Sequence, residues 1–226
     1  MNPLIIALDV DTTAEALRLV EEIGPAADFY KVGMELYAVG GLPFVSQLRE
    51  MGKQIFLDLK LYDISETVKR TTRQLCERSG ATFLTVHGSR AVMQAAVEGR
   101  GSCPTKLLAV TVLTSFNQSD LADLGYSMPV SELVELLVRK AVESGMDGIV
   151  CSPLEVARVR ELAGPSMTLV TPGVRSADAA AGDQKRVTTP RQAIDNGADH
   201  LVIGRQVTRA AHPRQAAEEI LSEITG

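Results

Sequence analysis

Tryptophan is absent from this chain of 226 residues, and aromatic residues make up only 4% of it. Cysteine is scarce as well: Cys76, Cys103 and Cys151 lie far apart and form no C-x-x-C pair. Such spacing suggests neither a zinc knuckle nor a disulfide framework. We therefore expect reduced, mostly buried thiols and no metal site built on cysteine.

Basic tracts and long apolar runs are also missing. The 23 Lys and Arg residues are outnumbered by 28 Asp and Glu, which gives a formal net charge of −5. This balance argues against a nucleic-acid partner, although the protein could still hold an anion locally. No apolar stretch approaches the ~18 residues of a membrane span. The N-terminal run 4–8 lacks the basic flank and the length of a signal peptide, so we expect a cytoplasmic protein with no membrane partner.

The chain does contain a repeated strand–helix pattern. Short apolar runs rich in β-formers alternate with segments whose apolar residues recur at helical spacing, such as TAEALRLVEEI and SELVELLVRKAVESG. The runs predict eight strands, at 4–9, 28–33, 54–60, 82–87, 106–114, 147–152, 167–173 and 199–204.

Near-continuous apolar strands alternating with helices indicate a parallel sheet covered by helices. Eight such units in a chain close to the typical ~250 residues predict one (β/α)8 TIM barrel over residues 1–226. A doubly wound open sheet is the alternative, but it would normally have fewer strands. Two long polar stretches, 115–129 and 174–187, would emerge at the carboxyl end of such a barrel and are candidate lids.

Charged residues at the ends of the predicted strands need an explanation, because barrel strands should be apolar inside. Asp9, Lys31, Asp58 and Lys60 occupy such ends, and Asp63 follows just beyond. Two residues apart on a strand, Asp58 and Lys60 should project to the same side. A structural ion-pair network is one interpretation. Acids and bases converging on the carboxyl rim of a barrel favour an active site.

The seventh and eighth predicted strands lead into an arrangement typical of phosphate binding. TPGVR supplies Gly173 and Arg175, and VIGR supplies Gly204 and Arg205 before the last helices. Glycine permits close backbone approach, and a guanidinium adds a forked cation. His87, after the fourth strand, could act as a base, but we expect a structural role for it.

With these residues in place, the sequence resembles the bacterial type of orotidine 5′-phosphate decarboxylase. The segments FLDLKLYDI, VTPGVR, AGDQKR and VIGRQVT carry the resemblance, which runs in order over essentially the whole chain. It implies decarboxylation of orotidine 5′-phosphate to uridine 5′-phosphate, the last step of de novo pyrimidine synthesis, with no cofactor and no metal.

The resemblance also assigns roles within the charge cluster. Lys60 is the expected proton donor to C6 of the pyrimidine, and Asp58 should lie against the departing carboxylate. Asp9 and Lys31 match the positions that hold the ribose hydroxyls. A preorganised ammonium would stabilise the carbanion that forms when CO2 leaves.

Further roles follow from the same resemblance. Asp63, Ile64 and Thr67 are expected to reach across a homodimer interface into the neighbouring site, and Thr114 and Ser115 to contact the pyrimidine. The residues that match the phosphate grip are Gln184, Gly204 and Arg205, with Arg175 nearby.

Two alternatives remain open. A related barrel enzyme that decarboxylates or cleaves sugar phosphates shares the D-x-K-x-x-D strand but uses Mg²⁺. In those relatives a carboxylate ligand stands where this chain has Lys31, whose charge would repel a metal ion. The other alternative is a catalytically silent barrel that binds a nucleotide, which would not require so costly a charge cluster.

Overall fold

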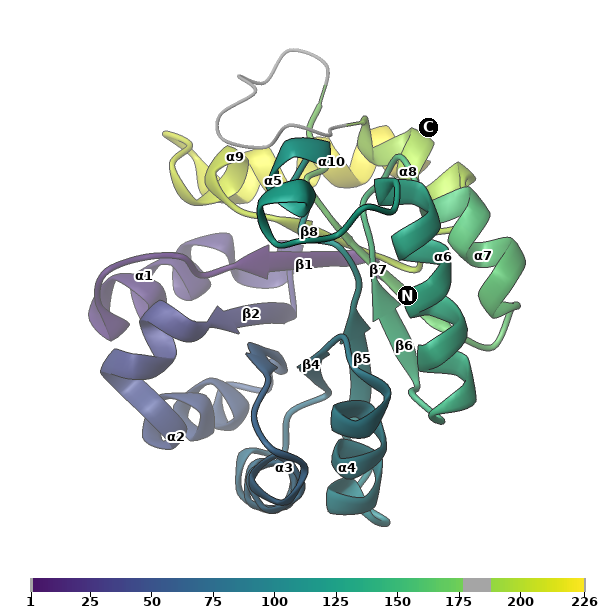
Figure 1. Cartoon of the computed structure of the whole chain (residues 1–226). Coiled ribbons are helices and arrows are strands. Elements are labelled where there is room, and N and C mark those ends of the chain that lie inside the picture. The colour runs from purple at the N-terminus through teal and green to yellow at the C-terminus, as the bar shows by residue number, and fades with distance from the viewer. Residues whose placement is uncertain (1, 177–187, 226) are drawn as a thin grey trace.

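The computed structural model describes residues 2–176 and 188–225, and its parallel strands close into a barrel in the order β1 to β8 (Figure 1). Each strand pairs with the next, and β8 pairs with β1. The eight-strand (β/α)8 TIM barrel predicted from the sequence is therefore confirmed. The strands are β1 Leu4–Ala7, β2 Phe29–Gly33, β3 Gln54–Leu61, β4 Phe83–His87, β5 Lys106–Val110, β6 Gly148–Val150, β7 Thr168–Pro172 and β8 His200–Ile203.

Helices surround the barrel and cover the outer faces of its strands (Figure 1). The short 3-10 helix η1, Gly24–Ala26, follows α1. Within α2, Gly41 adopts a φ of 53° and divides the helix at a kink. The helices are α1 Thr13–Ile23, α2 Met34–Glu50, α3 Ser65–Ser79, α4 Arg90–Arg100, α5 Gln118–Asp123, α6 Val130–Glu143, α7 Val156–Ala163, α8 Pro190–Asp195, α9 Arg205–Thr208 and α10 Pro213–Thr225. In the described part of the chain, no helix is both long and apolar enough to cross a membrane.

Inward-facing side chains fill the barrel in layers of four, drawn from alternate strands as is typical of this fold. Strand alternation and the pairing registers define four such layers. The lowest of these four, which lies above the hydrogen-bonded Lys106 and Thr168 at the amino ends of the odd strands, holds Phe29, Phe83, Gly148 and His200. The second layer holds Ile5, Phe56, Leu108 and Val170. The third holds Lys31, Thr85, Val150 and Val202, and the fourth holds Ala7, Asp58, Val110 and Pro172.

The predicted strand boundaries differ from the structure mainly at carboxyl ends. The fifth strand, expected to reach residue 114, ends at Val110, and the first ends at Ala7 instead of Asp9. Although Val112 and Leu113 are apolar enough to suggest a longer strand, the chain has already left the sheet there. These early exits leave Asp9 and Thr114 in loops at the barrel mouth.

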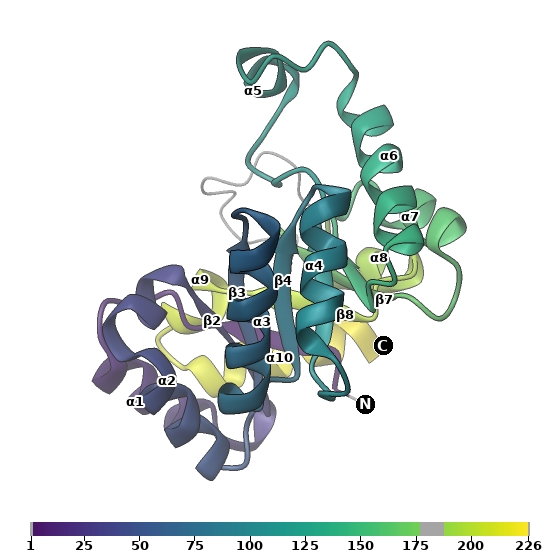
Figure 2. The ribbon, with the colours of Figure 1, turned by 60° about the horizontal axis from the view of Figure 1, so that its bottom comes forward.

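The two candidate lids have different outcomes. Residues 115–129 contain helix α5, which stands beyond the carboxyl end of the barrel and leads into α6 (Figure 2). Asn117 and Asp120 form a capping box that begins this helix. Most of the other candidate, 174–187, lies outside the described residues. At its base, Val174 and Thr188 form an isolated parallel bridge.

Candidate active site

A cavity of about 500 Å³ opens at the carboxyl end of the barrel. Strands β2 and β3 and the loop after β1 supply its cluster of alternating charges, and the loops after β5, β7 and β8 complete the wall. Five basic and three acidic side chains line it, although the chain as a whole is acidic. The basic residues are Lys31, Lys60, Arg175, Arg205 and Arg209, and the acidic residues are Asp9, Glu35 and Asp58. An excess of positive charge suits an anionic ligand.

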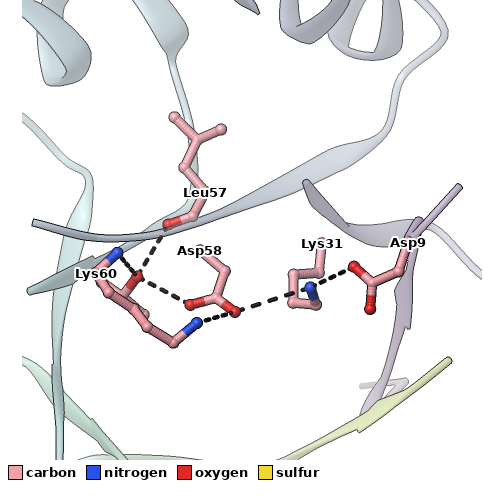
Figure 3. A network of polar contacts seen from close by, with 6 residues as sticks. Asp9, Lys31, Leu57, Asp58 and Lys60 are labelled. Atoms are coloured by element: carbon pink, nitrogen blue, oxygen red, sulfur yellow. Dashed lines mark hydrogen bonds and ion pairs between the residues drawn. The ribbon is translucent and has the colours of Figure 1, made fainter. Parts of the chain in front are cut away.

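Four charged side chains form a row across the cavity in which the signs alternate (Figure 3). Lys60 Nζ lies 2.9 Å from Asp58 Oδ2, and Lys31 Nζ lies 3.8 Å from the same oxygen. On the far side, Lys31 Nζ donates to Asp9 Oδ1 at 2.8 Å. The structure thus brings together the four strand-end charges that the sequence singled out.

Burial is greatest at the two middle members of this row, Asp58 and Lys31. Exposed fractions of the side chains are 10% for Lys31, 15% for Asp58, 29% for Lys60 and 56% for Asp9. Buried charges cost several kcal/mol each unless they are paired, and here the two most buried groups each lie between two opposite charges. The array therefore persists at the edge of an apolar barrel because its members compensate one another.

Strand β3 departs from regular geometry at Lys60. Its pairing with β4 shifts register between Leu57 and Leu61, and Lys60 has a φ of 48°. The side chains of Asp58 and Lys60 meet on one side, as expected, although the strand between them is not regular. Sequence reasoning missed Thr85, whose hydroxyl accepts from Lys60 N at 2.9 Å and lies 3.0 Å from Asp58 Oδ1.

Basic and glycine residues from β7, β8 and the following loops form another part of the wall. Arg175, Gly204 and Arg205 line the cavity as predicted. Gly204 immediately precedes α9, and a methyl group added there would meet only Ala7 Cβ, at an ordinary 3.6 Å. Packing against the protein therefore does not demand glycine at this position, whereas closeness to a ligand would. Arg209 joins this wall, and its i, i+4 spacing from Arg205 was a signal in the sequence.

The remaining predicted site residues divide into three groups. Thr114 and Ser115 line the cavity. Asp63, Ile64 and Thr67 do not; they are exposed, at or just after the turn that follows β3. Gln184 lies outside the described residues. Glu35, in the first turn of α2, lines the cavity without having been predicted.

His87 packs against an aromatic ring beside the charge row. Its ring stacks edge-on against Tyr62 with centroids 5.5 Å apart. Burial, with a further contribution from the positive charge of Lys60, lowers the pKa of His87 below its ordinary value. The imidazole is therefore neutral near pH 7.

Within residues 2–176 and 188–225, no three His, Cys, Asp or Glu side chains gather as a metal site would require. All three cysteines are thiols, not disulfides; Cys76 and Cys151 are buried and Cys103 is partly buried. Burial raises the pKa of the Cys76 thiol to about 12, so this group does not supply a thiolate.

Fold and cavity together define a (β/α)8-barrel protein with an acid–base array at its carboxyl mouth and a basic wall suited to an anion. The family model described as "Orotidine 5′-phosphate decarboxylase / HUMPS family" matches residues 2–220. The chain belongs to this family.

Individual relatives agree with that assignment. The chain is 54% identical over 221 residues to an orotidine 5′-phosphate decarboxylase of Rhodopseudomonas palustris strain BisB5, covering 98% of this chain and 94% of the relative. It is 51% identical to one from Methylorubrum extorquens, at the same coverages. The crystal structure of orotidine 5′-phosphate decarboxylase from Lactobacillus acidophilus superposes with a TM-score of 0.88, at 36% identity and full coverage of both chains.

Proposed function

We propose that this protein is an enzyme that decarboxylates orotidine 5′-phosphate to uridine 5′-phosphate and CO2 without a cofactor, in pyrimidine biosynthesis. The observation that carries the proposal is the alternating row of Lys60, Asp58, Lys31 and Asp9 in a cavity whose other charged residues are mainly basic. Membership of the family supports the choice of substrate.

The reaction needs a proton donor and a fixed electrostatic environment. The bond from C6 to the carboxylate carbon breaks, its electron pair stays on C6, and CO2 leaves. A proton from Lys60 Nζ then forms the C6–H bond, and solvent returns a proton to the amine. No adjacent group delocalises the electron pair, so stabilisation must come from charges already in place.

The carboxylates and the second lysine hold that environment in place. Asp58 lies against the substrate carboxylate in this scheme, and its contact with Lys60 aims the ammonium before substrate arrives. Asp9, at the open end of the row, and the buried Lys31 beside it bind the ribose hydroxyls. Thr114 and Ser115 contact the pyrimidine.

The phosphate takes no part in bond making but supplies binding energy that can be converted into rate. Arg175, Gly204 and Arg205 bind it, together with Gln184. Closure of segment 115–129 over the bound nucleotide would exclude water from the reacting atoms.

Assembly and location complete the proposal. Asp63, Ile64 and Thr67 act in the neighbouring site of a homodimer, which agrees with their exposure and their absence from the cavity wall. The polypeptide functions as one domain over residues 1–226, in the cytoplasm, with no nucleic-acid or membrane partner.

The test is to follow pyrimidine absorbance after mixing the protein with orotidine 5′-phosphate in excess EDTA. We expect rapid conversion, and a loss of at least about 10³-fold in kcat for Lys60→Ala, which removes both the proton donor and its charge. Lys69→Ala removes an exposed lysine that pairs with Glu98 and is the matched control.

Two outcomes would contradict the proposal. Activity on a sugar phosphate only after Mg²⁺ is added would identify the metal-dependent branch. Tight binding of uridine 5′-phosphate without turnover of either substrate would identify a silent nucleotide-binding barrel.

A further inference from the structure

Thr85 lies inside the barrel beneath the charge row, and its side chain is inaccessible to solvent. It belongs to the third layer, together with Lys31, and follows Phe83 by two residues on β4. A threonine in a strand ordinarily reflects β-propensity alone. Here its hydroxyl contacts two of the groups assigned to the reaction.

The Thr85 hydroxyl both accepts and donates, and its one proton has acceptors within reach. It accepts from the backbone N–H of Lys60 at 2.9 Å. Its single proton has Asp58 Oδ1 at 3.0 Å and the Leu57 carbonyl oxygen at 3.5 Å as acceptors. The shorter contact is to a charged acceptor, and such hydrogen bonds are the stronger ones. The hydroxyl thus links the Lys60 backbone to the carboxylate that also binds the Lys60 ammonium.

The Lys60 backbone has particular need of such a partner. Among the described residues, Lys60 alone has a positive φ without being glycine. This left-handed conformation costs about 1–2 kcal/mol for a residue with a side chain. Between the pairs Leu57–Leu84 and Leu61–Val86, β3 also contains two more residues than β4. The Lys60 N–H therefore binds a side-chain oxygen of β4 in place of a backbone carbonyl.

We propose that Thr85 is a positioning residue, which holds the Lys60 backbone in its left-handed turn and orients the Asp58 carboxylate toward the Lys60 ammonium. Asp58 uses one oxygen for Thr85 and the other for Lys60 Nζ, so a single hydroxyl fixes the relative positions of the proton donor and its partner. The consequence for catalysis rests on the function proposed above.

The competing explanation is that Thr85 only fills space. Substitution by valine distinguishes the two explanations, because valine has a similar shape but no hydroxyl. Thr85→Val keeps the branched shape while removing the hydroxyl, and Thr85→Ser keeps the hydroxyl while removing a methyl group. Thr171→Val is the matched control, because Thr171 is a fully buried strand threonine whose hydroxyl has no partner among the described residues.

Steady-state kinetics with orotidine 5′-phosphate give the first measurement. We expect Thr85→Val to lower kcat about 10- to 100-fold with KM changed less than about threefold, because the loss is one of alignment at the reacting atoms. Thr85→Ser should recover kcat to within about threefold of wild type, and Thr171→Val should match wild type. If Thr85→Val does not fold, Thr85→Ala removes the same hydroxyl from a smaller side chain.

Crystal structures of the variants give a second measurement that does not depend on turnover. We expect Thr85→Val to lose either the left-handed φ of Lys60 or its 2.9 Å contact with Asp58, and Thr85→Ser to keep both. A wild-type protein that fails to decarboxylate would contradict the proposed function but leave this structural test intact. The inference is overturned if Thr85→Val keeps both features and wild-type kcat, or if Thr85→Ser is as slow as Thr85→Val.

Discussion

Two layers inside the same barrel, both supplied by the even-numbered strands, have opposite properties. The lowest layer is aromatic and closed, with Phe29 and Phe83 in contact at a centroid distance of 5.0 Å. The third layer, two residues further along each strand, contains the ammonium of Lys31 and the hydroxyl of Thr85. The same strands therefore provide a packed floor, which is the lowest layer, at one end and charged and polar groups at the other.

Close packing fills the lower layer. Phe83 contacts the rings of Phe29, Phe56 and His200 at centroid distances of 5.0 to 5.9 Å. The fourth position is Gly148, where an added Cβ would lie 2.4 Å from Leu108 and 2.5 Å from a backbone oxygen. Glycine is required there because its neighbours already fill the space.

In the third layer the polar groups are compensated by residues of the layer above it and of the mouth. Lys31 contacts carboxylates of both Asp9 and Asp58, and Thr85 bonds to Asp58. Alternation along a strand thus determines which side chains enter the barrel, while position along the strand determines whether they are apolar and packed or polar and paired. A floor that does not yield keeps the charges above it at fixed positions.

The largest expected effect comes from breaking the floor. Phe83→Ala should lower the free energy of unfolding by about 3–5 kcal/mol, because it removes a buried ring and leaves a cavity. Activity per folded molecule, measured well below the unfolding temperature, should stay within about threefold, since Asp58 lies three layers above.

Urea unfolding followed by circular dichroism measures the first quantity, and kcat the second. Phe116→Ala, a partly buried aromatic residue outside the barrel interior, is the control for loss of ring area. If Phe83→Ala has the same free energy of unfolding as wild type, the packing of this ring in the floor does not stabilise the barrel.

The sequence was sufficient to predict the barrel and most of its mouth. Asp58 and Lys60 were identifiable because charge is rare in an apolar strand, and Arg205 because it follows a strand and a glycine. Thr85 was not identifiable, since threonine is common in strands and the register shift that brings the Lys60 backbone to its hydroxyl has no signal in the sequence. The left-handed turn at Lys60 was also hidden within a segment that has the composition of a regular strand.

Helix α5 was not predicted, although the sequence contains a signal for it. The Asn117–Asp120 spacing is a capping pattern, and it begins helix α5 inside a stretch expected to be a long polar loop. The early end of β5 had no such signal, because Val112 and Leu113 extend the apolar run past the last paired residue. Barrel closure, which is a tertiary constraint, sets that end.

A smaller effect is expected at the barrel mouth. Because the mouth is less tightly packed than the floor, a substitution there should lower activity without lowering the free energy of unfolding. Arg205→Ala should lower kcat/KM about 10- to 100-fold, the typical effect of losing a charge-assisted hydrogen bond to phosphate. Because Arg205 is exposed, the free energy of unfolding should change by less than about 1 kcal/mol. Arg191→Ala is the control: this arginine is far in sequence from the cavity wall and pairs with Asp195 on α8. An unchanged kcat/KM would refute the phosphate assignment.

The smallest effect is a pH dependence of stability that comes from His200, the titratable side chain of the floor. Burial lowers the pKa of His200, and Lys106 acts in the same direction, whereas Asp199, Asp28 and the carbonyl of Pro3 oppose the shift. The folded state therefore binds fewer protons than the unfolded state over the interval below the ordinary histidine pKa of about 6.5. The sign follows directly: His200 makes the protein less stable as the pH falls through that interval, and it has no such effect above it.

His200→Asn should remove part of this pH dependence, because asparagine does not titrate. We expect the loss of unfolding free energy between pH 7.5 and pH 5.5, measured by urea denaturation, to be smaller in the variant by up to about 1 kcal/mol. His87 has a pKa shifted in the same direction, so its contribution remains in both proteins and cancels in the comparison. The exposed His212, changed to asparagine, provides the control. An identical pH dependence in His200→Asn and wild type would mean that the floor tolerates a charged imidazole, and the contrast between the two layers would then be one of packing alone.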